Sequence, residues 1–238
     1  MAISAGGAAT ARDPGPKGLD AGKVVEAATR LTREHGLTGW SMRDLAADLN
    51  VATSAIYHHV GDRAAVLREV VAGLVAAVKR ADPELDWQEW FEQTLSSLWG
   101  MLRDHRGVAH WLMMHGPTTA GAVDLVDAGI ASLQRGGFGE HAGFAHVLLL
   151  NQVIGAASLA DDRRVGGEAD GDRGRGTMLA DFERLAPVSP GMSALTESML
   201  RPVVDRPAVL ERYLQDALRT TMKGLAAELA DGWKTSRS

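Results

Sequence analysis

Four polar side chains gather on one side of a short segment in the first quarter of the chain. Thr53, Ser54, Tyr57 and His58 supply two hydroxyls, a phenol and an imidazole. If 53–59 is helical, these positions share a face, because helical neighbours recur three to four residues apart. Such groups form hydrogen bonds with base edges and phosphates in the major groove of DNA. The segment therefore predicts a helix that reads nucleic acid.

The residues around this helix have the spacing of a helix-turn-helix (HTH). Leu45 and Leu49 lie one turn apart on a preceding helix, Val51 fills the turn, and Ile56 faces back from the second helix. Asn50 sits where the chain must reverse, and Asn tolerates a left-handed backbone better than most residues other than Gly. This arrangement commits the apolar residues to a small core and leaves the polar face outside.

Nearly every other segment also has helical patterning, and no alternating strand pattern is present, so the sequence predicts an all-α fold. Asp20, Ser41 and Asp62 are suited to cap helices that begin at the residues following them. The further helices are expected at 87–103, 107–115, 119–135, 140–160 and 207–230. We expect a charged, glycine-rich loop at 161–176, and an irregular, proline-punctuated stretch between Pro187 and Pro207.

We expect the chain to divide into two domains at Asp82-Pro83. We expect a disordered tail at 1–18, rich in Gly, Ala and Pro, an N-terminal HTH domain at 19–80 that includes a linking helix, and a larger helical domain at 81–238. Residues 1–80 contain 10 Lys and Arg against 8 Asp and Glu, whereas the remainder contains 15 against 22. A mildly basic module on an acidic body favours DNA binding, although the whole chain has a net charge of -5.

The HTH segment resembles the tetracycline-repressor (TetR) family over about residues 20–70. The family signature, Ser/Thr-x-Arg-x-Leu-Ala-x-x-Leu-Gly-Val, then Ala-Leu-Tyr-x-His-Phe, then Lys-x-x-Leu, is matched here from Ser41 to Leu67. Three positions depart from it, because Asn50 replaces Gly, Val60 replaces Phe and Arg63 replaces Lys. The resemblance implies a three-helix N-terminal HTH DNA-binding domain and a larger C-terminal domain for ligand binding and dimerisation.

The resemblance also implies roles for the matched residues. Phosphate contacts are expected from Ser41, Tyr57, His59 and Arg63, and base-edge or phosphate contacts from Arg43 and Thr53. The backbone N–H groups at the start of the helix after Asp62 would face a phosphate. With the exposed polar face included, the predicted DNA-binding residues are Ser41, Arg43, Thr53, Ser54, Tyr57, His58, His59 and Arg63. The alternative for Tyr57 and His59 is that they pack in the small core.

The C-terminal half is rich in Trp and Met, which suit flat, apolar ligands. The predicted ligand-binding residues are Trp90, Trp99, Trp111, Met114, His115, Phe144 and Asn151. For each aromatic residue, ordinary core packing remains the alternative. Dimerisation is expected on 140–160 and 207–230, where apolar stripes could equally be intrachain core.

Several function classes find no support in the sequence. His105, His110 and His115 recur every five residues and do not share a helical face, so no metal site is expected. The chain carries no known catalytic signature, and its Gly-x-Gly-x-x-Ala run at 137–142 follows a helix rather than a strand. We expect no enzyme activity and no cofactor.

The absence of cysteine fits a cytoplasmic protein, and the most apolar run, 147–150, is too short to span a membrane. The working hypothesis is a homodimeric transcription regulator, a repressor by family default, that binds a palindromic DNA operator and releases it when a small, largely apolar effector binds. The alternatives are a helical ligand-binding or interaction protein that has lost DNA binding, and a helical enzyme without an identifiable catalytic set.

Overall fold

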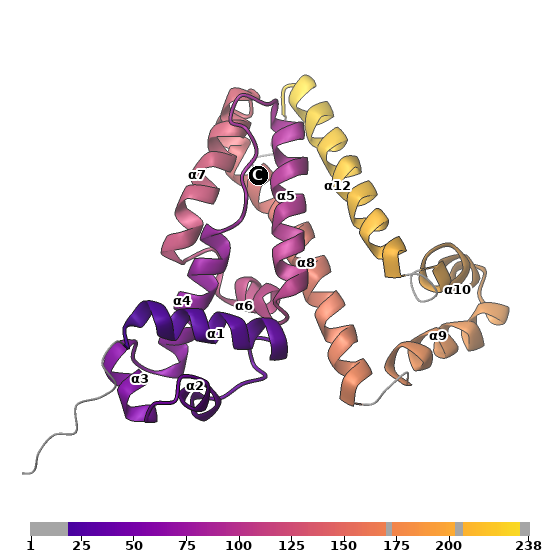
Figure 1. Ribbon diagram of the computed structural model, residues 1–238. Coiled ribbons are helices and arrows are strands. Elements are labelled where there is room, and N and C mark those ends of the chain that lie inside the picture. The colour runs from indigo at the N-terminus through magenta and orange to yellow at the C-terminus, as the bar shows by residue number, and fades with distance from the viewer. Residues whose placement is uncertain (1–18, 170–172, 203–206, 234–238) are drawn as a thin grey trace, which may run out of the picture.

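The computed structural model describes residues 19–169, 173–202 and 207–233, and in these ranges all regular secondary structure is helical (Figure 1). The predicted tail at 1–18 lies outside the described residues. Three helices form the N-terminal unit, and these are α1 (Ala21–His35), α2 (Met42–Asp48) and α3 (Thr53–His59). Helix α4 (Arg63–Ala76) packs against both α1 and α7 (Ala120–Arg135), so it joins this unit to the rest of the chain.

The body is built from long helices that enclose an apolar core. Helices α5 (Trp87–Asp104), α6 (Val108–His115) and α7 pack against α8 (Ala142–Ala169), which a short 3-10 turn, η1 (Gly139–His141), precedes. Helix α12 (Pro207–Ala230) also packs against α8. Between α8 and α12, the chain forms α9 (Arg173–Leu185), η2 (Ala186–Val188), α10 (Pro190–Leu195) and η3 (Thr196–Leu200), which extend to one side of the body (Figure 1).

Local sequence explains where the N-terminal helices begin and end. The side chains of Asp20 and Asp62 accept hydrogen bonds from backbone N–H groups in the first turns of α1 and α4, as predicted for N-caps. Ser41 and Asp44 form a reciprocal capping box at the start of α2. Gly36 ends α1 with a φ of 83°, a conformation that costs glycine little because it has no Cβ.

Two predictions about the connecting segments were wrong. The expected loop at 161–176 is largely helical, because α8 continues to Ala169 and α9 begins at Arg173. Helix α8 is already stabilised by buried residues such as Val153 and Ala157, and extending an existing helix costs less than nucleating one. The stretch after Pro187 contains α10, in which Pro190 occupies the first turn behind a Ser189 cap and therefore starts the helix rather than interrupting it.

The segment Gly139–Asp161 is long and apolar enough to cross a membrane by length and composition alone. Half of it is buried within the fold, where α8 packs against α5, α6, α7 and α12. These contacts account for its apolar character as that of a core helix in a folded protein.

Candidate nucleic-acid interface

The turn between α2 and α3 has the geometry that the sequence predicts. Asn50 has a φ of 53°, in the left-handed region expected for the reversal. The Val51 N–H donates to the Ala46 carbonyl at 3.0 Å, which closes the turn. Leu45 and Ile56 are completely buried, so each of the two helices anchors one side of a shared core. The rigid pairing of α2 and α3 fixes which face of α3 points outward.

The outward face of α3 presents four residues that we call the recognition face: Thr53, Ser54, Tyr57 and His58. Ser54, Tyr57 and His58 are exposed, with half of the Tyr57 side chain accessible, and Thr53 is half-buried. None of the four forms a hydrogen bond or an ion pair with another described residue. Their donors and acceptors are therefore available to an external partner, as a groove-reading surface requires.

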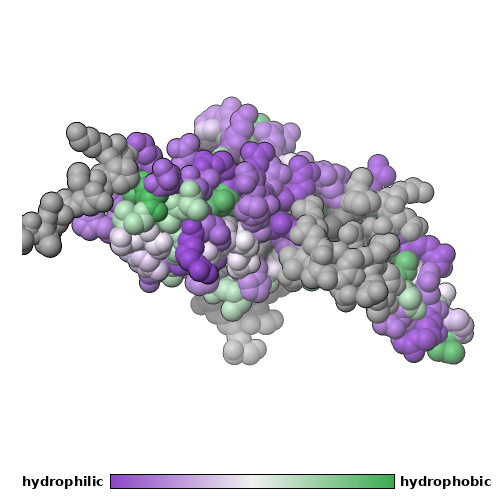
Figure 2. Space-filling view, turned by 60° about the horizontal axis from the view of Figure 1, so that its bottom comes forward, coloured by the Kyte–Doolittle hydropathy of each residue, from purple (hydrophilic) through white to green (hydrophobic). Residues whose placement is uncertain are grey.

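The HTH end of the molecule is turned toward the viewer in Figure 2, where hydrophilic residues are interspersed with a few hydrophobic ones. Arg43 on α2 is exposed and forms no hydrogen bond with a described residue. His59 is also exposed, and its ring meets that of His58 edge-on at 5.5 Å. The roles of Arg43 and His59 as DNA contacts stay predictions.

Two other predicted phosphate contacts have partners within the chain. The Ser41 hydroxyl donates to the Asp44 carboxylate at 2.7 Å, and this bond is the main cause of the lowered pKa of Asp44. The Arg63 guanidinium donates to the carbonyls of Leu37 and Trp40 at 3.2 and 3.1 Å and lies over the Trp40 ring. The geometry therefore gives Arg63 a structural task that the sequence did not reveal, which is to hold the loop between α1 and α2.

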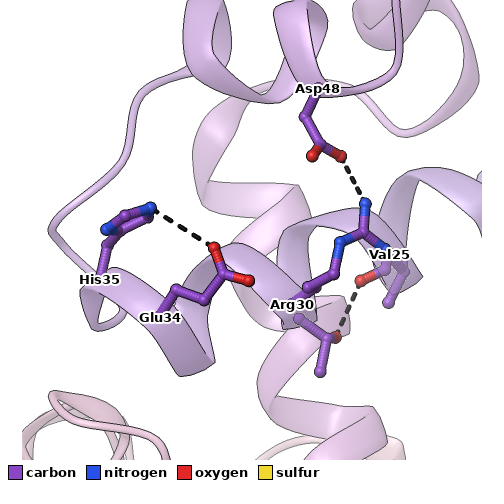
Figure 3. Close-up of polar contacts among 6 residues, drawn as sticks. Val25, Arg30, Glu34, His35 and Asp48 are labelled. Atoms are coloured by element: carbon purple, nitrogen blue, oxygen red, sulfur yellow. Dashed lines mark hydrogen bonds and ion pairs between the residues drawn. The ribbon is translucent and has the colours of Figure 1, made fainter.

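The N-terminus of helix α4 also has a partner within the chain. The Asp62 side chain accepts a hydrogen bond from the Ala65 N–H at 2.8 Å, so a carboxylate already occupies the N-terminus that was expected to face a phosphate. Within the HTH, Arg30 of α1 pairs with Asp48 of α2 at 2.5 Å, and Glu34 lies 3.7 Å from His35 (Figure 3). The Arg30 pair joins the first two helices and uses one basic residue that DNA could otherwise attract.

The short loop between α5 and α6 is hydrogen-bonded to both the HTH and the body. The Leu37 N–H donates to the Arg106 carbonyl at 2.8 Å, and the next residue, Gly107, donates its N–H to the Asp161 carboxylate at 2.8 Å. Asp161 belongs to α8 and is almost completely buried. The loop between α5 and α6 thus contacts the α1–α2 loop on one side and α8 on the other, which gives movements of the body a direct path to the HTH.

The body contains a groove between α5 and α12 with a volume of about 540 Å³. Among the predicted ligand-binding residues, Trp99 lines this groove. Trp90 is buried in the core, where its ring meets Phe91 edge-on at 4.9 Å. Trp111 stacks on His115 at 4.3 Å on α6, away from the groove.

The remaining predicted ligand residues lie on the surface of the chain. Met114, Phe144 and Asn151 are all exposed, with Met114 68% and Phe144 61% accessible. The groove residues that sequence reasoning missed, such as Glu92 and Met222, come from segments more than a hundred positions apart. No local pattern could pair them, because only the packing of α5 beside α12 brings them together.

Comparison with known proteins agrees with this geometry. Residues 24–70 match the family described as "Bacterial regulatory proteins, tetR family". No curated protein matches the chain significantly over its sequence. Several solved structures share its fold at identities of 20–23%.

One such structure is ActR from Streptomyces coelicolor without ligand, with a TM-score of 0.73, 23% identity, and coverage of 93% of this chain and 100% of that one. A TetR variant from Acinetobacter baumannii AYE in complex with minocycline gives a TM-score of 0.66, 20% identity, and coverage of 92% and 97%. BioQ with its double-stranded DNA operator gives a TM-score of 0.54, 22% identity, and coverage of 61% of this chain and 88% of that one.

The geometry of α2, α3 and the turn between them defines the N-terminal part of the chain as an HTH domain. Residues 24–70 of the N-terminal domain match the tetR family of bacterial regulatory proteins, so this part of the chain is similar to the DNA-binding domains of that family. The likeness of the body to the solved structures establishes its fold.

Proposed function

We propose that the protein is a homodimeric repressor that binds a palindromic DNA operator through α3 and releases it when a small, largely apolar molecule binds to the C-terminal half. The observation that carries the proposal is the recognition face, which lies on the outer side of the HTH and forms no hydrogen bond or ion pair with another described residue. Proteins of similar fold support it, because BioQ is described with its DNA operator and ActR in complex with actinorhodin. A repressor of this kind would act in the cytoplasm.

The proposed dimer face lies on α8. Phe144, Val147 and Leu159 are apolar yet 54–61% exposed, and they recur at intervals that place them along one side of the helix with the exposed Asn151. Ile154 and Ala157 of the same helix are instead buried within the chain. An exposed apolar row on an ordered helix favours a protein partner, and a second copy of the same helix would cover it.

The residue contacts also suggest how the effector would act. Two recognition helices must match a fixed half-site separation of about one DNA turn, so a change in the angle between body and HTH weakens both contacts at once. The bonds from Leu37 to Arg106 and from Gly107 to Asp161 link the HTH, the end of α5 and α8. A ligand that shifts α5 relative to α8 would therefore alter the position of the HTH.

The test is a gel shift with DNA from upstream of the gene that encodes the protein. We expect Tyr57→Ala to weaken binding by about tenfold, because one side chain on a groove-reading helix contributes roughly 1–3 kcal/mol. Gln134→Ala, an exposed substitution on α7, is the matched control and should bind like the wild type. Sequence-selective binding that is equal in all three proteins would show that α3 is misassigned. No selective binding at low salt would leave a helical ligand-binding protein that has lost DNA binding.

A further inference from the structure

The α5–α12 groove combines an apolar floor with a polar rim. The floor is formed by buried apolar side chains from both helices, namely Leu95, Trp99, Leu214, Leu218 and Met222. The rim carries exposed polar and charged side chains, namely Glu92, Gln93, Ser96, Glu211, Gln215 and Arg219. A volume of about 540 Å³ falls within the roughly 300–1,000 Å³ of small-molecule sites, and this division of chemistry is typical of them.

One donor in the groove wall lacks a partner. The indole Nε1 of Trp99 is buried, the side chain is only 8% exposed, and no acceptor within hydrogen-bond distance is found among the described residues. A buried N–H without an acceptor is energetically costly, and in native proteins it is usually paired. The indole ring forms part of the groove wall, so this unpaired N–H lies beside the groove between α5 and α12.

The rim supplies a complementary acceptor. Glu92 lies seven residues, or two helical turns, before Trp99, on the same side of α5, and its carboxylate forms no ion pair with a described residue. The other charged rim residues are already paired, since Arg219 lies 3.1 Å from Asp216 and Glu211 lies 3.9 Å from Arg103. Glu92 is therefore the rim carboxylate best placed to accept a hydrogen bond from a ligand.

We propose that the effector binds in the α5–α12 groove and is a mainly apolar molecule with a carbonyl oxygen that accepts from Trp99 and an N–H or O–H donor that reaches Glu92. The inference rests on the proposed function, in which the C-terminal half senses a small molecule. It adds the location of the site and the order of polar groups along the ligand. Helix α5 ends at the loop that bonds to Leu37, so occupation of this groove acts on the element that contacts the HTH.

The experiment uses two probes of matched shape, 2-aminoanthraquinone and 2-aminoanthracene, of which only the first carries carbonyl acceptors. Affinities for the full-length protein are measured by equilibrium dialysis, which does not depend on the fluorescence of Trp99 itself. We expect the wild type to bind the quinone about tenfold more tightly, because one buried hydrogen bond is worth about that factor. Trp99→Phe should abolish the preference, and Trp111→Phe, outside the groove, should retain it.

Ser96→Phe, at an exposed rim position, should block both probes without affecting the core and provides a second variant if Trp99→Phe unfolds. Glu92→Gln should reduce the affinity for 2-aminoanthraquinone by a few-fold and leave that for unsubstituted anthraquinone unchanged. Absence of binding by either probe, or an equal preference in Trp99→Phe, would overturn the proposal. A wild type that shows the preference but no selective DNA binding would refute the regulatory function while supporting the site.

Discussion

Helix α7 crosses α4 closely at Gly121, and this contact offers a sharp test of the packing that holds the HTH to the body. A methyl group added at Gly121 would overlap the carbonyl oxygen of Ala72 and lie 3.1 Å from the Cβ of Ala76. The overlapping atom belongs to the backbone, so it cannot rotate away as a flexible side chain would. Gly121→Ala must therefore separate α7 from α4 or strain both helices.

The expected cost follows from this geometry. Overpacking of a tight contact costs about 1–3 kcal/mol, and the higher helical propensity of alanine offsets up to about 1 kcal/mol of it. We therefore expect a net loss of roughly 1–2 kcal/mol in the free energy of unfolding. For a chain of this length, each kcal/mol lowers Tm by about 2–4 °C, so Tm should fall by about 2–8 °C.

The matched control lies in α4 itself. A Cβ at Gly73 meets no atom within 4 Å, so Gly73→Ala should gain helical propensity without strain and raise Tm by a few degrees, about 2–4 °C. Both variants are compared with the wild type by thermal unfolding, followed by far-ultraviolet circular dichroism. Equal shifts in the two variants, or a higher Tm for Gly121→Ala, would refute the close crossing of α4 and α7.

Three further predictions concern two polar groups with defined hydrogen-bond partners, Arg63 and Asp161, and one buried imidazole, His146, whose ring nitrogens have no hydrogen-bond partner among the described residues. Arg63→Ala should lower the free energy of unfolding by about 1–3 kcal/mol in urea denaturation, and Arg63→Lys should restore only part of it, because lysine lacks the planar guanidinium that lies over the Trp40 ring while one of its nitrogens donates to two carbonyls; full restoration would contradict that role. Asp161→Ala should cost about 1–3 kcal/mol by leaving the Gly107 N–H unpaired, and an unchanged denaturation midpoint would show that this bond contributes nothing. Burial lowers the pKa of His146 below its ordinary value of 6.5, so the unfolded chain binds a proton more readily and stability should decrease as the pH falls below that value. His146→Leu should lose this part of the pH dependence, and an unchanged profile would exclude His146 as its source.

The HTH could be predicted closely from the sequence, since its determinants are local. The caps at Asp20, Ser41 and Asp62 and the reversal at Asn50 depend on residues within a few positions of one another. Helix periodicity likewise placed the long helices, and the predicted range 207–230 coincides with α12. Caps, turns and helix periodicity depend on residues that are close in sequence, so a short segment is enough to predict them.

The features that sequence reasoning missed depend on contacts between distant segments. Arg63 was expected at a phosphate, but its guanidinium is bound to carbonyls that lie 23 and 26 positions away. Asp161 was placed in a loop, whereas it is a buried residue of α8 whose partner, Gly107, is 54 positions away. A pattern within a short segment cannot predict such pairs, because the partners meet only after the helices have packed.

The candidate ligand residues illustrate the same limit. Trp-rich composition pointed to the C-terminal half, where the groove lies, and Trp99 is part of the groove wall. Composition could not separate Trp99 from Trp90, which is buried on the same helix, or from Trp111, which lies outside the groove. The distinction depends on where α12 packs, and that is a property of the tertiary fold.

The most direct test of the central claim is the ratio of two affinities. Fluorescence anisotropy would measure binding of the full-length protein to its own upstream DNA and to a scrambled fragment of equal length, at several salt concentrations. We predict a preference of about a thousandfold or more for the upstream DNA, with both affinities decreasing as salt rises. Equal affinities for the two fragments at every salt concentration would contradict the account of α3 as a sequence-reading helix.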